Sequence, residues 1–293
     1  MLFDGEIKNQ SERFDSADIY HRLYCLTNTG KTVMSQTFEF CLLEKRDHIW
    51  VVTINRPEAM NSLHPAANFE LETIFNDFAE DKSAWVAIIT GAGGRAFCTG
   101  NDLKFQASGG KLEIPETGFA GLTSRFNLDK PVIAAVEGYA MGGGFEIALA
   151  CDLIVADPSA KFALPEPKVG LAALAGGIHR LSRQIGEKQA MEILLTARRI
   201  GGEEGKAMGF VNRVSEAGGV MEEALKLAEE IIVCSPVSIQ MTKQMVRQGQ
   251  QFSDLETAVS HPYDAIMTLF TSSDFIEGPM AFMEKRAPKW SGE

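Results

Sequence analysis

The sequence has no apolar run long enough to cross a membrane and no excess of positive charge. A membrane-spanning helix needs about 18 or more consecutive apolar residues. The longest run here, FEIALACDLIVA, is short and interrupted by charge. Aspartate and glutamate outnumber lysine and arginine by 39 to 28, which gives a net charge of −11. Because an acidic surface repels nucleic acid, we expect neither a membrane nor a nucleic-acid partner.

Paired cysteines and closely spaced histidines are also missing. The five cysteines are odd in number, scattered along the chain and form no CxxC motif. This pattern is typical of reduced residues in a cytoplasmic protein. The five histidines show no metal-ligand spacing. We therefore expect a cytoplasmic protein that holds no metal.

The first 34 residues are polar and mixed in charge. A signal peptide would have an apolar centre, and a mitochondrial presequence would be basic and poor in acids. We predict a poorly ordered extension over residues 1–34, a core over 35–230 and a helical C-terminal region over 231–293. Met34 is a candidate natural start, because a clear strand pattern begins just after it.

Short apolar strands alternate with helices between residues 38 and about 170, which predicts an α/β layered core. From about Gly177 the pattern is helical, and MEEALKLAEEIIV has the apolar stripe of an amphipathic helix. The expected elements before Gly177 are a hairpin over 38–57, strands over 85–91, 131–138, 152–157 and 161–166, and helices over 64–81 and 142–152.

The stretch VAIITGAGGRAF, residues 86–97, raises the possibility of a dinucleotide-binding loop. Such a loop needs its glycines to open a helix, and an acidic residue about 20 positions further on, at the end of the next strand. Here the glycines lead into FCTG, which is poor helix-starting sequence. Glu113 lies at the right distance but follows no helix–strand unit. The pattern therefore disfavours a dinucleotide-dependent oxidoreductase.

A second glycine cluster, GYAMGGGFE, contains three consecutive glycines at positions 142–144. Glycine permits close packing of backbone against backbone, and it equally lets a ligand approach main-chain amides. A helix that begins near Gly143 would direct free N–H groups and the positive end of its dipole toward an anion. These residues by themselves leave both interpretations open.

Both glycine stretches, together with INRPEAMN, resemble the crotonase superfamily, the enoyl-CoA hydratases and isomerases. The resemblance runs from about Phe38 to the C-terminus and includes AFCTGNDLK, FALPEPKVGL, AGGIHRLSR and EGPMAFMEKR in the family's order. It implies an α/β fold, the crotonase (ClpP-like) spiral of repeated β-β-α units, with C-terminal helices that form a homotrimer or a dimer of trimers. The stretches FAGLTSRFNLDKPVIAAVEGYAMGGGFE and EGPMAFMEKRAPKW look closest to the carnitinyl-CoA dehydratase branch.

The resemblance also implies four catalytic residues. The backbone N–H groups of Asn101 and Gly143 would bind the thioester oxygen of an acyl-CoA. Glu146 would activate a water molecule, and Glu166 would supply the proton to the α-carbon. Because isomerases of this family often lack one of these acids, the presence of both favours addition or elimination of water.

The CoA moiety of the substrate is the only cofactor that the resemblance implies. Lys104 and Lys285 match positions that contact CoA in relatives, the latter often across a subunit boundary. The acidic Glu58 follows NRP, where relatives are often basic, which weakens one such contact. The remaining expected contacts with CoA are Ala59, Asp102, Leu103 and Gly142.

Two segments near the expected site depart from the family pattern. Ala173 and Leu174 replace a Pro-Gly pair whose glycine amide helps to hold the water in typical hydratases, and leucine adds bulk there. Asn101 stands where many hydratases have alanine, so its side chain could contact a polar acyl group or simply favour the turn.

We therefore expect an enoyl-CoA hydratase that adds water reversibly to a trans-2-enoyl-CoA. The alternatives are a carnitinyl-CoA-type dehydratase, an enoyl-CoA isomerase, and a non-catalytic relative that binds CoA or a protein.

Overall fold

The computed structural model describes residues 33–293. The extension predicted for residues 1–34 therefore lies almost entirely outside the described residues. Its last two positions belong to an unanticipated edge strand, β1 (Val33–Thr37), which pairs antiparallel with β2 (Cys41–Arg46). The predicted hairpin follows, because β2 also pairs antiparallel with β3 (Ile49–Ile54).

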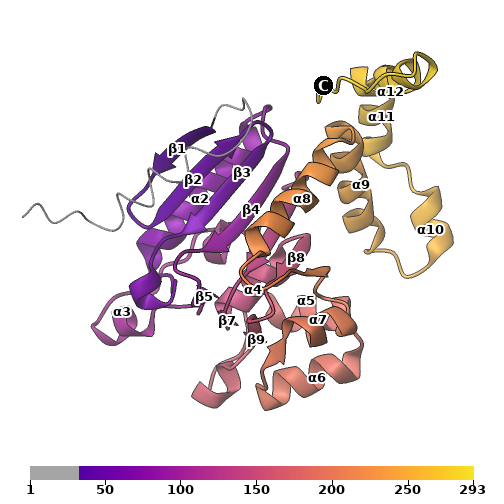
Figure 1. The fold of residues 1–293 in the computed structure, drawn as a ribbon. Helices are drawn as coiled ribbons and strands as arrows, with labels where there is room; N and C mark the ends of the chain where they lie inside the picture. The colour runs from indigo at the N-terminus through magenta and orange to yellow at the C-terminus, as the bar shows by residue number, and fades with distance from the viewer. Residues whose placement is uncertain (1–32) are drawn as a thin grey trace, which may run out of the picture.

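Seven strands form the large sheet, in the order β1-β2-β3-β4-β6-β8-β11 (Figure 1). From β3 onward each neighbouring pair is parallel. A smaller sheet has the order β10-β9-β7-β5, in which the last three strands are parallel. The remaining strands are β4 (Val86–Gly91), β5 (Ala96–Cys98), β6 (Val132–Val136), β7 (Tyr139–Met141), β8 (Leu153–Ala156), β9 (Lys161–Ala163), β10 (Ile200–Gly201) and β11 (Arg213–Val214).

Consecutive strands alternate between the two sheets. The chain passes from β4 to β5, from β6 to β7 and from β8 to β9, each time leaving the large sheet for the small one. A helix follows each of the first two pairs: α3 (Leu103–Ala107) after β5 and α4 (Gly143–Ala150) after β7. Each turn thus adds one strand to both sheets, which confirms the predicted spiral of β-β-α units.

The two faces of the large sheet bury different side chains, because side chains alternate along a strand. Along β3, Trp50, Val52 and Ile54 join the main core, to which α2 (Pro65–Glu80) also contributes its apolar face. Ile49 and Val51 point to the opposite face, where α8 (Val220–Ile232) covers them. Figure 1 shows α8 crossing the front of this sheet.

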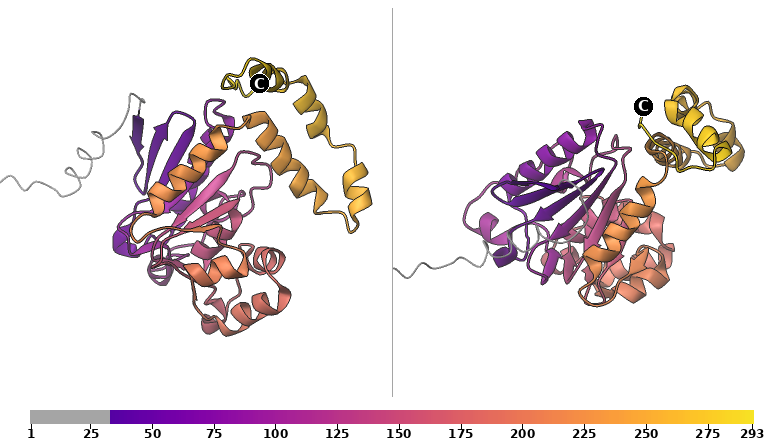
Figure 2. Two further views of the ribbon diagram at one scale, coloured as in Figure 1. Left: turned by 45° about the vertical axis from the view of Figure 1, so that its right-hand side comes forward. Right: turned by 45° about the horizontal axis from the view of Figure 1, so that its top comes forward.

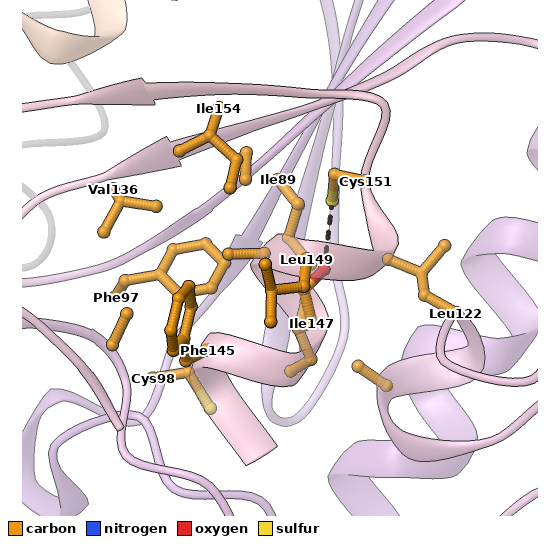
Figure 3. Close-up of a cluster of buried hydrophobic side chains, with 14 of the residues drawn as sticks. Ile89, Phe97, Cys98, Leu122, Val136, Phe145, Ile147, Leu149, Cys151 and Ile154 are labelled. Atoms are coloured by element: carbon orange, nitrogen blue, oxygen red, sulfur yellow. Dashed lines mark hydrogen bonds between the residues drawn. The ribbon is translucent and has the colours of Figure 1, made fainter. Parts of the chain in front are cut away.

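The helix α4 lies within the core. Phe145, Ile147 and Leu149 are all buried, and they pack among side chains from the strands and from the loop at Leu122 (Figure 3). At its end, the Cys151 thiol donates to Ile147 O at 3.3 Å. Since a helix that is apolar on all sides is stable only when buried, any charged group on α4 must find its partners inside the protein.

The C-terminal arm, residues 236–285, projects from the body of the molecule (Figure 2). Lys243 anchors it to Asp152 at 2.7 Å, and Arg247 anchors it to Asp129 at 2.8 Å. The domain boundary after residue 230 stays a prediction, and α8 continues two residues beyond it. The other helices are α5 (Gly177–Gln184), α6 (Glu187–Thr196), α7 (Gly202–Met208), α9 (Pro236–Gly249), α10 (Leu255–Ser260), α11 (Asp264–Thr271) and α12 (Ser273–Met283).

None of the helices in residues 33–293 combines the length and apolar character needed to cross a membrane.

One helix was not anticipated, and one predicted strand boundary is wrong. The segment after Asn101 contains the short helix α3, because the Asp102 carboxylate caps its start by accepting from Phe105 N at 3.1 Å. The strand β9 ends at Ala163, so Glu166 does not end a strand. It instead opens a 3-10 turn, η4 (Glu166–Val169), in a segment whose prolines withhold the N–H groups that a ladder needs.

Removal of a side chain from the apolar face of α2 tests this packing. Leu71 is fully buried, so Leu71→Ala should lower the free energy of unfolding by about 2–5 kcal/mol, because it leaves a cavity. The matched control is Leu195→Ala on α6, where the side chain is 70 % exposed and the change should stay within about 0.5 kcal/mol. Denaturant unfolding at fixed protein concentration measures both, and equal effects would contradict the assigned burial.

Candidate active site

The glycine-rich turn after β4 closes around a side chain of its own chain. Asn61 Nδ2 donates to Ala92 O at 2.9 Å and to Ala96 O at 2.7 Å. A methyl group at Gly91 would overlap this amide and the neighbouring Phe97 O. The turn therefore binds the asparagine of the INRPEAMN segment, and it leads into β5 and not into a phosphate-binding helix.

The backbone at Asn101 is held by a parallel bridge to Leu63. Leu63 N donates to Gly100 O at 2.8 Å, and Asp102 N donates to Leu63 O at 3.0 Å. In a parallel ladder, the residue between two such partners directs its own N–H away from the bonded strand. The Asn101 N–H therefore points away from Leu63.

Gly100 brings this backbone against the start of α4. Its φ is +85°, and a methyl group on it would lie 2.9 Å from Gly143 N and 3.1 Å from Met141 O. Gly143 is the first residue of α4, so its N–H lies at the positive end of the helix and has no partner within it. The structure thus brings together the segments that carry the two expected oxyanion donors, Asn101 and Gly143.

The three glycines at the start of α4 serve different contacts. A methyl group at Gly142 would lie 3.0 Å from Glu166 Oε1, and one at Gly143 would lie 2.8 Å from the Phe119 ring. A methyl group at Gly144 would overlap the backbone of Cys98. Close packing therefore explains Gly144, whereas Gly142 leaves room for a carboxylate beside the expected donor.

Glu146 lies in the first turn of α4 and is only 3 % exposed. Its Oε1 accepts from Gly177 N at 2.8 Å. Burial and the nearby charge of Glu166 raise the pKa of Glu146 to about 7, against the opposing effects of the Gly177 and Ala175 amides and of Arg180. At neutral pH the carboxyl group therefore populates both protonation states, which suits a group that exchanges protons.

Glu166 faces the same region from η4. Burial raises its pKa, and its Oε2 is buried without a hydrogen-bond partner. Buried polar atoms are almost always paired, so an unpaired carboxylate oxygen marks a place for a bound molecule. Because Oε1 lies against Gly142, and Glu146 N donates to Gly142 O at 3.0 Å, both acids flank the start of α4.

The family model for enoyl-CoA hydratase/isomerase matches residues 44–293. The chain belongs to this family. The carnitinyl-CoA dehydratase of Escherichia coli strain K12 is 42 % identical over 259 residues, which cover 85 % of this chain and 97 % of the relative. The carnitinyl-CoA dehydratase of Proteus mirabilis strain HI4320 is 39 % identical over 268 residues, or 88 % and 100 % of the two chains.

Solved structures agree with this placement. The enoyl-CoA hydratase from Mycobacterium tuberculosis H37Rv superposes with a TM-score of 0.83 at 39 % identity, over 87 % of this chain and all of the other. The carnitinyl-CoA hydratase from Mycobacterium avium gives a TM-score of 0.70 at 38 % identity, over 88 % of this chain and all of the other. The predicted crotonase superfamily and its carnitinyl-CoA dehydratase-like branch are confirmed, and the protein is a hydro-lyase.

The expected CoA contacts near α3 lie close to the oxyanion segment. Arg56 donates to Asp102 Oδ2 at 2.9 Å, which ties the end of the INRP segment to the start of α3. Burial favours the neutral form of Asp102, but the hydrogen bonds from Phe105 N–H and Arg56 outweigh it and hold the pKa below its ordinary value. Asp102 thus caps α3, and its expected contact with CoA stays a prediction. Of the other expected contacts, Leu103 and Lys104 are exposed on α3, and Ala59 is half-buried.

Lys285 lies on the C-terminal arm, at an exposed position just after α12. Figures 1 and 2 show α12, at the far end of this arm, well separated from α3 and α4. Within one chain the structure therefore does not bring Lys285 together with the other expected CoA contacts. A contact between Lys285 and CoA across a subunit boundary stays a prediction.

The side chains of Leu174 and Asn101, which depart from the family pattern, both have defined positions. The Leu174 side chain is 83 % exposed, so its bulk lies at the surface of the chain. The Asn101 side chain donates to Gln106 Oε1 at 3.1 Å and thereby contacts α3.

One residue at the site, Arg180, received no role from the sequence. Its guanidinium donates to Thr123 O at 2.8 Å, beside the segment that holds Glu146. The signal in the sequence was its position three residues after Gly177, which places both on one face of α5.

A methyl group placed at Gly100 tests the oxyanion geometry. Gly100→Ala should reduce the kcat for hydration of a short enoyl-CoA about 10²–10³-fold, because it displaces the Gly143 amide and loses about 3 kcal/mol of transition-state stabilisation. The matched control is Gly109→Ala: Gly109 has a similar φ of +92° but no atom within 4 Å of an added methyl group. Gly109→Ala should keep its activity in a spectrophotometric assay. A similar loss in both variants would attribute the effect to backbone strain instead.

Proposed function

We propose that this hydro-lyase is an enoyl-CoA hydratase, which adds water reversibly to a trans-2-enoyl-CoA through a thioester enolate. The observation that supports the proposal is the convergence at the start of α4 of two backbone donors and two carboxyl groups, one buried and one half-buried. Asn101 and Gly143 supply the donors, and Glu146 and Glu166 supply the acids.

The two amides stabilise the charge that develops during the reaction. When water attacks the β-carbon, negative charge moves to the thioester oxygen. Amides about 2.7–3.1 Å from that oxygen stabilise it without reorganisation, and one such donor contributes about 3 kcal/mol. Gly143 adds the field of α4, while the bridge to Leu63 holds the Asn101 amide in place.

The two acids divide the proton transfers. Glu146 in its ionised form takes a proton from the attacking water, and Glu166 in its protonated form delivers a proton to the α-carbon. A pair of carboxyl groups in opposite protonation states performs both steps near neutral pH. Burial raises the pKa of Glu166, which supports its protonated form. Burial also raises the pKa of Glu146, but the Gly177 and Ala175 amides and Arg180 favour the ionised form that accepts the proton. Elimination of water follows the same path in reverse.

The CoA moiety is the only cofactor that this chemistry requires, and no metal takes part. The expected path of the CoA moiety on one subunit is lined by Ala59, Asp102, Leu103, Lys104 and Gly142. Lys285 reaches it from a neighbour in a homotrimer or a dimer of trimers. We place the enzyme in the cytoplasm, which agrees with the free thiols of the four described cysteines.

The second candidate is a carnitinyl-CoA-type dehydratase, which the 42 % identity to the Escherichia coli enzyme of that name favours. It uses the same donors and acids on a different acyl group. Isomerase activity has less support, because both acids are retained. A non-catalytic role does not explain why Glu166 Oε2 is buried without a hydrogen-bond partner.

Removal of either acid should abolish water addition. Glu146→Gln and Glu166→Gln should each lower kcat about 10²–10⁴-fold, because each deletes one proton transfer. The matched control is Glu137→Gln, which should keep its activity. Burial and the charge of Asp157 raise the pKa of Glu137 as well, but its carboxyl group lies beside Gly94 in the turn after β4. Activity is followed as loss of the conjugated thioester absorbance.

Three substrates separate the candidates in the same assay. Fastest turnover of crotonyl-CoA supports the hydratase, fastest turnover of crotonobetainyl-CoA supports the dehydratase, and double-bond migration in a 3-enoyl-CoA supports an isomerase. Full activity in both Gln variants would contradict all three mechanisms.

The proposed homotrimer should depend on the apolar face of α12. Ile276, Met280 and Met283 follow one another at helical spacing, and all are exposed in the single chain. Met283→Glu should shift the sedimenting species from three or six chains of 32.0 kDa toward one, because it places charge in an apolar interface. Met34→Glu, an equally exposed position on β1, should leave the assembly intact. A wild-type protein that sediments as one chain would contradict the proposal.

A further inference from the structure

Arg180 links two loops that lie on either side of the catalytic helix. Its Nη2 donates to Thr123 O at 2.8 Å, and its Nη1 donates to Ala175 O at 3.5 Å. It is partly buried, and burial lowers its pKa while the nearby charge of Glu146 opposes that shift. One guanidinium thus joins the loop before β6 to the loop before α5. Such bridging suits arginine, because its planar fork presents several donors in fixed directions.

The loop before α5 also carries the partners of Glu146. Gly177 N donates to Glu146 Oε1 at 2.8 Å. A methyl group at Gly177 would lie 3.0 Å from the same oxygen, and one at Gly176 would overlap Arg180 Nη1. The two adjacent glycines therefore let the carboxylate and the guanidinium pack against one short segment. Any displacement of Arg180 moves the segment that holds Glu146.

Among the groups around Glu146, Arg180 is a cation that favours the ionised carboxylate. Glu166 approaches from η4 and opposes ionisation, whereas the Ala175 and Gly177 amides and Arg180 favour it. On β5, burial raises the pKa of the Cys98 thiol to about 12, so it is uncharged. The Cys151 thiol beyond α4 is uncharged as well, because burial raises its pKa. The 3-10 turn that contacts α4 presents Phe119, which has no charge.

We propose that Arg180 is a positioning residue for water addition. It holds the Ala175–Gly177 segment closed on Glu146, and its charge keeps the Glu146 carboxylate in the ionised form that activates water. Arg180 itself does not contact the substrate. The inference rests on the proposed function, because it assumes that Glu146 acts as the base.

Two substitutions separate the bridge from the charge. Arg180→Met removes both, so kcat should fall about 10²-fold as the base is misplaced. The acid limb of the pH–kcat profile should also move to higher pH, because loss of a nearby cation makes the carboxylate harder to ionise. Arg180→Lys keeps the charge but cannot span both carbonyl groups, so kcat should fall while the limb stays in place. KM should change little in either variant.

The matched control is Arg183→Met. Arg183 lies one turn later on α5, is exposed, and donates only to His179 O at 2.9 Å. This variant should keep the wild-type kcat and pH profile. Circular dichroism and thermal unfolding report whether each variant is folded. If Arg180→Met does not fold, the Arg180→Lys profile alone decides.

These experiments distinguish a failure of the Arg180 proposal from a failure of the proposed function. An Arg180→Lys variant with wild-type kcat, or a folded Arg180→Met variant with an unshifted acid limb, would overturn the role of Arg180. If Glu146→Gln is inactive in the same experiments, the proposed function survives that result. If Glu146→Gln keeps full activity, the proposed function itself fails, and with it the inference.

Discussion

The site depends on the close approach of two backbone segments, the one at Gly100 and the one at Gly143. With a methyl group at position 100 only 2.9 Å from Gly143 N, no side chain other than hydrogen fits between them. This contact sets where the amides of Asn101 and Gly143 lie relative to each other. It exists because β5 and β7 are parallel neighbours in the small sheet, so that the segments following them leave the same edge.

The two acids follow from the same arrangement. The helix α4 begins at the end of β7 and passes straight into the core, so Glu146 in its first turn is buried as soon as the fold forms. Burial raises the pKa of both carboxyl groups, because it disfavours their charged forms. The Gly177 and Ala175 amides, together with Arg180, restore part of the stability of the charged form of Glu146. The pKa of Glu146 therefore lies at about 7, close to neutral pH.

Local patterns predicted most of the elements but not all of the roles. Apolar patterns identified α2, α4, α8 and most strands of the large sheet, because each pattern reports which face is buried. They did not identify β1 and β11. They also missed α3, whose helix depends on one capping carboxylate, and they extended β9 to Glu166, where prolines end the ladder. Arg180 was missed for a different reason: its partners, Thr123 and Ala175, are backbone carbonyl groups that leave no mark in the sequence.

The sequence by itself determined the α/β class and the order of most elements, and its family resemblance indicated the two acids. These properties depend on neighbours along the chain, or on motifs read as a whole. Only the tertiary structure decided that Asn101 and Gly143 converge, that Glu166 keeps an unpaired oxygen, and that Lys285 lies away from its own chain's site. Such properties depend on burial and on distances between segments far apart in the chain, which come into existence only when the two sheets and α4 pack together.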